Sequence, residues 1–141
     1  MEESRNLKIE LGIQSVKVRE FLNKPDTSPS EGELKISYNF SLTVEAARDV
    51  LIITVGVFYW KESPDNRLFS LTVDNTFLVK DLASFQKGIS YEIPDSIIHT
   101  LLSISISHTR GLLAHYSSGT PFESFLLPII PMDDLVKNLV W

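Results

Sequence analysis

Four long runs of apolar residues within the first 79 positions constrain the fold more than any other feature. The clearest run, residues 33–44, carries an apolar side chain at every second position from Leu34 to Val44. Such alternation predicts a strand with one face in the core and the other in water. Residues 50–60 are apolar at both sets of positions, which is typical of a central strand or of one covered by a partner.

Residues 7–22 and 68–79 predict two further strands. In the first of these runs the apolar positions change from odd to even numbers near Gln14 and Ser15. Side chains in a strand alternate with a period of two, so this change needs an extra residue, and we expect a β-bulge there. Polar segments that predict turns or loops separate the runs. Four consecutive strands would form an antiparallel meander.

The chain after residue 92 predicts a long helix. Asp95 follows Ile93 and Pro94 and could cap the first turn. Apolar residues then recur at helical spacing, although residues 103–107 alternate like a strand. Gly119 and then Pro121 can end a helix, so we expect it to span residues 96–117.

A second, short amphipathic helix is expected from Met132 to the last residue, with Pro131 near its first turn. Together these elements predict an α+β fold, in which a four-stranded antiparallel sheet is covered on one face by a long and a short helix. The 141 residues suit one domain over residues 1–141.

Composition excludes several classes of function. The net charge of −5 disfavours nucleic-acid binding, because no basic stripe is available to displace phosphate counterions. The absence of cysteine excludes disulfides and cysteine-based metal sites. The first residues lack the pattern of a signal peptide, and no apolar run reaches the roughly 18 residues that a membrane helix needs. We therefore expect a cytoplasmic protein without membrane insertion.

No residue pattern indicates catalysis. On one helix, His99 and His108 would face opposite sides, and His108 and His115 would lie roughly 10 Å apart along the axis. Neither pair could bind one metal ion, whose ligands lie about 2 Å away. Asp133 and Asp134 are explained by the dipole of the expected last helix, with an acid/base pair as the alternative. We expect no enzyme activity, no cofactor and no metal site.

Apolar residues exceed what the expected fold can bury. Two helices cover only one face of a four-stranded sheet, yet residues 50–60 are apolar on both faces. Contiguous exposed apolar surface usually marks a partner site. One interpretation is an interface between copies of the chain, and another is a groove for extended apolar polypeptides. A pocket for a small ligand is a third, and it would require convergent polar groups.

Several short motifs, in a fixed order, resemble the SecB family of protein-export chaperones. The resemblance covers nearly the whole chain, since the order of elements is also similar. The motifs are Leu68-Phe69-Ser70-Leu71-Thr72-Val73, Ile93-Pro94, Thr109-Arg110-Gly111, Ser118-Gly119-Thr120-Pro121-Phe122 and Leu127-Pro128-Ile129-Ile130-Pro131.

The resemblance implies an ATP-independent holdase, which would bind unfolded polypeptides and deliver them to SecA for export. It also implies a homotetramer, assembled as a dimer of dimers with the long helices in the middle. The outer positions of residues 35–43 carry no acidic patch of the kind that helps family members dock SecA. A SecB-like chaperone for a narrow client, such as the antitoxin of a toxin–antitoxin pair, is therefore the alternative.

The client groove of the family, carried over to this sequence, predicts five client-binding residues. Each of them could equally be an ordinary core residue. They are Leu34, Ile36 and Tyr38 in the second expected strand, and Leu135 and Leu139 in the expected last helix.

Overall fold

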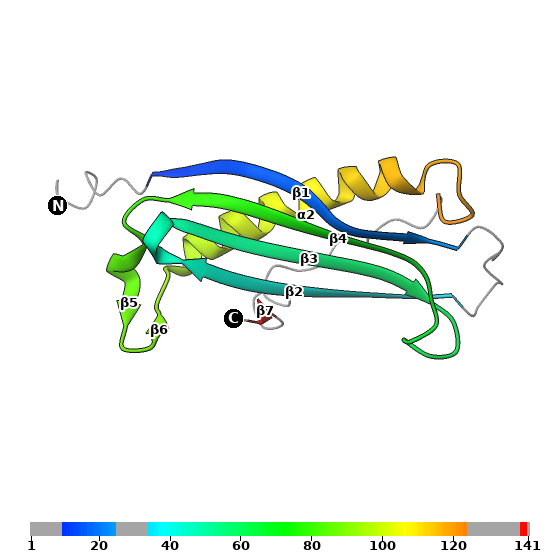
Figure 1. Cartoon of the computed structure of the whole chain (residues 1–141), viewed down its shortest axis with the longest axis horizontal. Helices are drawn as coiled ribbons and strands as arrows, with labels where there is room; N and C mark the ends of the chain where they lie inside the picture. The colour runs from blue at the N-terminus through cyan, green and yellow to red at the C-terminus, as the bar shows by residue number, and fades with distance from the viewer. Residues whose placement is uncertain (1–9, 25–33, 124–138, 141) are drawn as a thin grey trace.

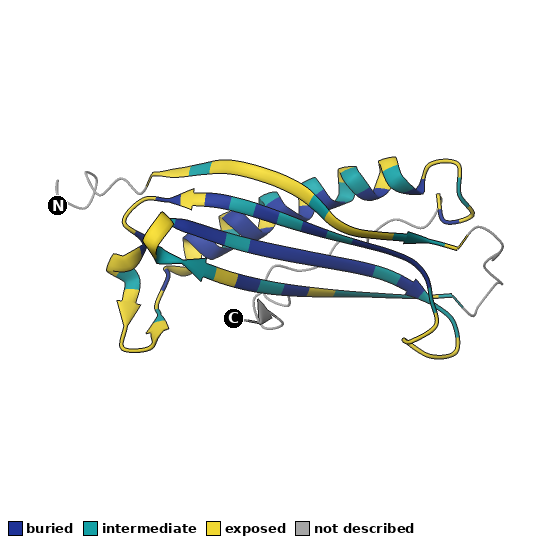
Figure 2. Cartoon of the chain, viewed as in Figure 1, coloured by how far each residue is buried: buried dark blue, intermediate teal, exposed yellow. Residues whose placement is uncertain are grey.

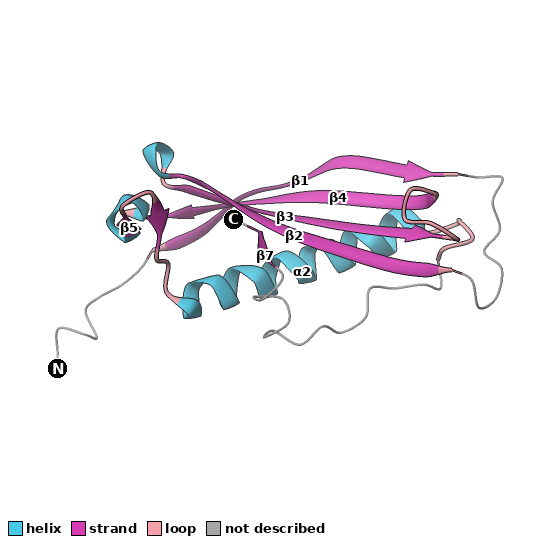
Figure 3. Cartoon of the chain, turned by 90° about the horizontal axis from the view of Figure 1, so that it is seen from below, coloured by secondary structure: helices cyan, strands magenta, loops and turns pink. Residues whose placement is uncertain are grey.

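One long helix crosses a single face of an elongated, twisted sheet (Figures 1 and 3). The structure is a computed structural model that describes residues 10–24, 34–123 and 139–140. The four long strands lie close to the positions that the apolar runs predict. They are β1 (Leu11–Asn23), β2 (Lys35–Glu45), β3 (Val50–Trp60) and β4 (Arg67–Val79). The predicted α+β class, with an antiparallel four-stranded sheet, is confirmed.

The order of the strands differs from a simple four-strand meander. The sheet runs β1-β4-β3-β2-β7, where β7 is Leu139–Val140. The meander therefore holds for β2, β3 and β4, while β1 pairs with β4. This is a Greek-key arrangement, in which one strand returns to lie beside the far end of a three-strand meander. Alternation fixes which face of a strand is buried but not which neighbour the strand takes. β1 and β2 consequently lie on opposite sides of the β3–β4 pair (Figure 1).

β1 contains two irregularities in its pairing with β4. The register shifts between Ile13 and Ser15, where the sequence predicts a bulge, and again between Val18 and Glu20. The two shifts keep the apolar residues of β1 opposite odd-numbered residues of β4, which point toward the helix. The register pairs are Leu11 with Val79, Ile13 with Phe77, Val16 with Asn75, Val18 with Val73 and Phe21 with Leu71.

The long helix, α2 (Asp95–Ser117), matches the predicted span. Asp95 is its first residue and makes no side-chain capping bond, so its carboxylate acts only through the helix dipole. The alternating segment 103–107 is helical because Leu101, Leu102 and Ile106 are buried together. The buried Ser105 hydroxyl donates to the Leu101 carbonyl at 2.8 Å, so its polar group is satisfied within the helix.

Short elements occupy the connections. A 3₁₀ turn, η1 (Ala46–Arg48), joins β2 to β3, and another, η2 (Leu82–Phe85), follows β4. The hairpin of β5 (Gln86–Lys87) and β6 (Ser90–Tyr91) precedes the helix. Phe85 and Tyr91 pack against the core, whereas Ile89 at the hairpin tip is fully exposed.

The sequence predicts a short helix at the end of the chain. This prediction is wrong for Leu139 and Val140, the residues that the structure describes there. Residues 132–138 and Trp141 lie outside the described residues. β7 (Leu139–Val140) is a two-residue strand that pairs in parallel with Phe40 and Ser41 of β2. A free strand edge offers unpaired N–H and C=O groups, and pairing with them favours an extended backbone over a helical one.

The core lies between the inner face of the sheet and α2, and Tyr59 stands within it at 0% exposure. Burial raises the pKa of Tyr59 from 10.0 to about 12. Between these values the unfolded chain loses the phenolic proton while the folded chain keeps it. The free energy of unfolding therefore falls as the pH rises through this window, by about 2–3 kcal/mol. Urea unfolding across the window should show this loss in the native chain but not in Tyr59→Phe. Equal losses in both would assign the effect to other groups.

Candidate functional site

The titratable residues of the described part of the chain do not converge on a reaction centre. Within those residues no group of three or more His, Asp or Glu could hold a metal ion. His108 Nδ1 lies 3.0 Å from Asn75 Oδ1, and the buried Asn75 donates through Nδ2 to the Ile53 carbonyl at 3.3 Å. His108 thus completes the hydrogen bonding of a buried amide, which is a structural role. Asp133 and Asp134 lie outside the described residues.

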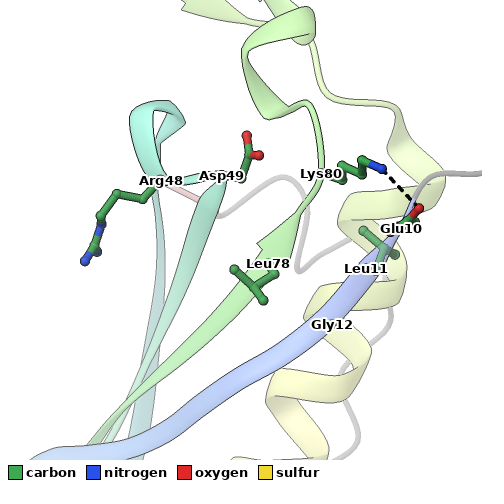
Figure 4. A pocket seen from close by; sticks show the side chains of 7 residues that line it. All are labelled: Glu10, Leu11, Gly12, Arg48, Asp49, Leu78 and Lys80. Atoms are coloured by element: carbon green, nitrogen blue, oxygen red, sulfur yellow. Dashed lines mark hydrogen bonds and ion pairs between the residues drawn. The ribbon is translucent and has the colours of Figure 1, made fainter.

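A hollow of about 360 Å³ lies beside the start of β1 (Figure 4). Its charged side chains are engaged with each other, with the neighbouring Glu45 or with the backbone, and they are not directed at a common point. Lys80 Nζ lies 3.4 Å from the Glu10 carboxylate, Arg48 pairs with Glu45, and Asp49 accepts from the Leu82 amide at 3.2 Å. The Arg48 side chain points away from the other lining residues (Figure 4). This hollow has no set of polar groups suited to one small ligand.

On the outer face of the sheet, apolar side chains of β3 pack against residues of the neighbouring strands. The Arg67 guanidinium lies 3.9 Å from the centre of the Phe58 ring, and Lys35 Nζ lies 5.3 Å from that of Trp60. Trp60 Nε1 also donates to Ser37 Oγ at 2.8 Å. β3 is apolar on both faces because it is a central strand whose outer side chains pack against residues of its neighbours. No partner is needed to explain it.

The predicted groove residues of β2 share the inner face of that strand. Leu34, Ile36 and Tyr38 are half-buried and pack against the core, with the Tyr38 and Phe40 rings 5.5 Å apart. Leu139 is brought to the same strand, because its backbone pairs with Phe40. The backbone of Leu139 therefore lies two positions along β2 from Tyr38 and further from Ile36 and Leu34. Leu135 lies outside the described residues.

The same inner face continues past β7 toward the end of β2. Leu42, Val44, Ile89, Ser90 and Tyr91 line a hollow of about 340 Å³ between β2 and the β5–β6 hairpin. Within the described residues, only Phe40 and Ser41 have a strand partner on the side of β2 away from β3. We call the inner-face residues Leu34, Ile36, Tyr38, Leu42 and Val44, with the open backbone beside them, the β2 edge.

A second apolar surface was not anticipated from the sequence. α2 packs mainly over β3 and β4, and most residues of β1 are exposed (Figure 2). Near the end of β1 the helix does make contact, because the ring centres of Phe21 and Tyr116 lie 4.8 Å apart. The four exposed apolar residues here, which we call the β1 face, are Leu11, Ile13, Val16 and Phe21, at 40%, 55%, 37% and 42% exposure. A hollow of about 310 Å³ separates Leu11 and Ile13 from Leu101 and Ile104 of α2. The two phase changes of this run, typical of a bulged edge strand, are the signal that could have revealed it.

Comparison with known proteins supports the fold. No family model matches the sequence, and no curated protein matches it. Among solved structures, the Mycobacterium tuberculosis SecB-like chaperone Rv1957, in complex with a ChAD peptide from the Rv1956 HigA1 antitoxin, is similar with a TM-score of 0.55. The sequences are 8% identical, and the match covers 86% of this chain and 90% of that one. A Streptococcus agalactiae protein of unknown function matches with a TM-score of 0.43 and 10% identity over 78% and 89% of the two chains.

The chain therefore has the fold of a SecB-like chaperone. At this level of identity the likeness establishes the arrangement of strands and helix. In the described residues no helix is long and apolar enough to cross a membrane.

Proposed function

We propose that this protein is an ATP-independent chaperone that holds non-native polypeptides and acts in the cytoplasm. The observation that carries the proposal is the β2 edge, where apolar side chains, most of them half-buried, lie beside a strand backbone that is largely unpaired among the described residues. An extended chain can bind such an edge through main-chain hydrogen bonds, which do not depend on its sequence. Burial of apolar area adds about 25 cal/mol per Å², again with little selectivity.

The similar fold of Rv1957 supports this function, because that chaperone is bound to a peptide of an antitoxin. The described part of the chain also offers no convergent polar site for an enzyme or a small-ligand binder. The clients could be of two classes, either preproteins for export or one dedicated client. Delivery of preproteins to SecA is what the sequence resemblance implies. A dedicated client is favoured by the outer face of β2, where Lys35, Ser37, Asn39, Ser41 and Thr43 form no acidic patch.

Self-association into a homotetramer, a dimer of dimers, is part of the proposal. The β1 face is apolar, and β1 is an edge strand of 13 residues. Long apolar edge strands are normally covered, and a second copy can cover one symmetrically. The residues of α2 that are exposed between positions 100 and 114 are all small, which would allow another helix to approach closely: Thr100, Ser103, Ser107, Gly111 and Ala114.

Suppression of aggregation tests the proposed function. A chemically unfolded protein diluted into buffer should scatter less light when one tetramer of this protein is present per client, without ATP. Bovine serum albumin at equal mass is the control for nonspecific crowding. Undiminished scattering at this ratio would refute the holdase proposal.

The same mixture separates the two client classes. If the protein serves export, SecA added to the complex should bind it and change the release of an unfolded preprotein. If it serves a dedicated client, SecA should have no effect.

A further inference from the structure

We propose that β7 is an internal occupant of the β2 edge and must leave before a client can pair there. The inference rests on the proposed function and extends it, because it assigns a competitor to the binding site. The ligand it competes with is an extended, apolar polypeptide segment. β7 is itself a short segment of this kind. Leu139 and Val140 are apolar, and their backbone is extended and pairs with Phe40 and Ser41.

The geometry places β7 in the middle of the proposed binding strip. β2 has 11 residues and pairs with β3 along its whole length. On its other side, among the described residues, β7 pairs with only two of the 11. Tyr38 and Ile36 lie on one side of these two positions, and Leu42 and Val44 lie on the other. A client strand that used the whole edge would have to take the place of β7.

The difference in length gives the exchange its direction. A two-residue pairing forms few backbone hydrogen bonds, whereas a longer client strand can pair beyond both ends of β7. A client strand that extends past Ser41 also gains apolar contacts at the hollow lined by Leu42, Val44 and Ile89. Long clients should therefore displace β7 while short ones should not. In the absence of clients, β7 shields the centre of an edge that would otherwise invite aggregation.

This proposal changes the role expected for Leu139. If Leu139 forms a wall of the groove, its removal weakens client binding. If β7 is the competitor, Leu139→Gly weakens the pairing of β7 and strengthens client binding, because a larger fraction of the protein is open. The sign of the change therefore separates the two roles.

A reversible crosslink tests the proposal in the 141-residue chain. Ser41 and Val140 are register partners, and neighbouring strands lie about 5 Å apart, within the Cα distance that a disulfide spans. The chain has no cysteine of its own, so Ser41→Cys with Val140→Cys introduces a single possible bridge. Affinity for fluorescently labelled, reduced and carboxymethylated α-lactalbumin is measured before and after dithiothreitol, with the single variant Ser41→Cys as the control.

We expect the bridge to form on oxidation and to weaken client binding by about tenfold or more, because the bridged protein cannot open. Dithiothreitol should restore binding, and Leu139→Gly should tighten it severalfold. Failure of the bridge to form, equal affinity in the bridged and reduced states, or weaker binding by Leu139→Gly would each overturn the proposal while leaving the holdase function intact. Absence of client binding by the native chain would instead refute the holdase function, and the proposal with it.

Discussion

Replacement of Phe122 by alanine is expected to lower the free energy of unfolding by about 3–5 kcal/mol, the usual cost of removing a buried phenylalanine ring. Phe122 is fully buried although it lies beyond the end of α2. Its ring centre is 5.7 Å from that of Tyr59 and 5.4 Å from that of Phe69, so it completes a cluster of three aromatic rings. Urea unfolding followed by circular dichroism should show a lower midpoint with little change in slope.

The turn before Phe122 explains how a residue outside the helix enters the core. Gly119 adopts a φ of 79°, which glycine tolerates well, and the Thr120 hydroxyl accepts from the Phe122 amide at 3.1 Å. Ser118→Ala, an exposed substitution in the same turn, is the matched control and should change stability by less than about 0.5 kcal/mol. A loss below about 1 kcal/mol in Phe122→Ala would show that the ring is not packed in the core.

The strands could be predicted from the sequence because their signal is local. The alternation from Leu34 to Val44 depends on which face is turned to the core, and the structure packs that face against the core, with Phe40 and Leu42 buried and the others half-buried. The bulge near Gln14 could also be predicted. The apolar positions change there from odd to even numbers, and within one strand this change requires an extra residue. The second register shift, between Val18 and Glu20, leaves the same signature, because the apolar positions change again from Val18 to Phe21. The partner of β1 could not be predicted, because pairing with β4 is a long-range choice.

Residues 103–107 and the C-terminus show the two ways in which local patterns fail. In residues 103–107 burial of Ile106 against the sheet, together with the internal bond of Ser105, outweighs the strand propensity of alternating serine and isoleucine. At Leu139 the opposite occurs, because helical spacing of apolar residues is overridden by an available strand edge.

The placement of the predicted client-binding residues follows in part from the sequence. Leu34, Ile36 and Tyr38 lie on one face, as alternation requires, and Leu139 joins them only through tertiary structure. The β1 face could not be identified from composition, since Leu11 and Ile13 resemble core residues in the sequence. They are exposed because α2 packs mainly over β3 and β4, and a hollow separates it from this part of β1.

The two apolar surfaces are expected to respond differently to polar substitution. Ile36→Ser with Tyr38→Ser should weaken client binding by roughly tenfold to hundredfold, because two partly exposed apolar side chains would no longer be buried by the client. Ile13→Ser with Val16→Ser should leave client affinity nearly unchanged and shift the mass in solution from a tetramer toward smaller species. Fluorescence anisotropy with an unfolded client measures the affinity, and sedimentation velocity measures the mass.

The two double substitutions are matched controls for each other. Each replaces two partly exposed apolar residues on the inner face of its strand, β2 in one case and β1 in the other. Circular dichroism and the thermal midpoint establish that each variant is folded before it is compared. If the β1 pair abolished client binding and the β2 pair did not, the β1 face would be the client site and the assignment to the β2 edge would be wrong. If neither pair altered the mass, the β1 face would have no part in self-association, and its exposure would then favour a partner other than a second copy.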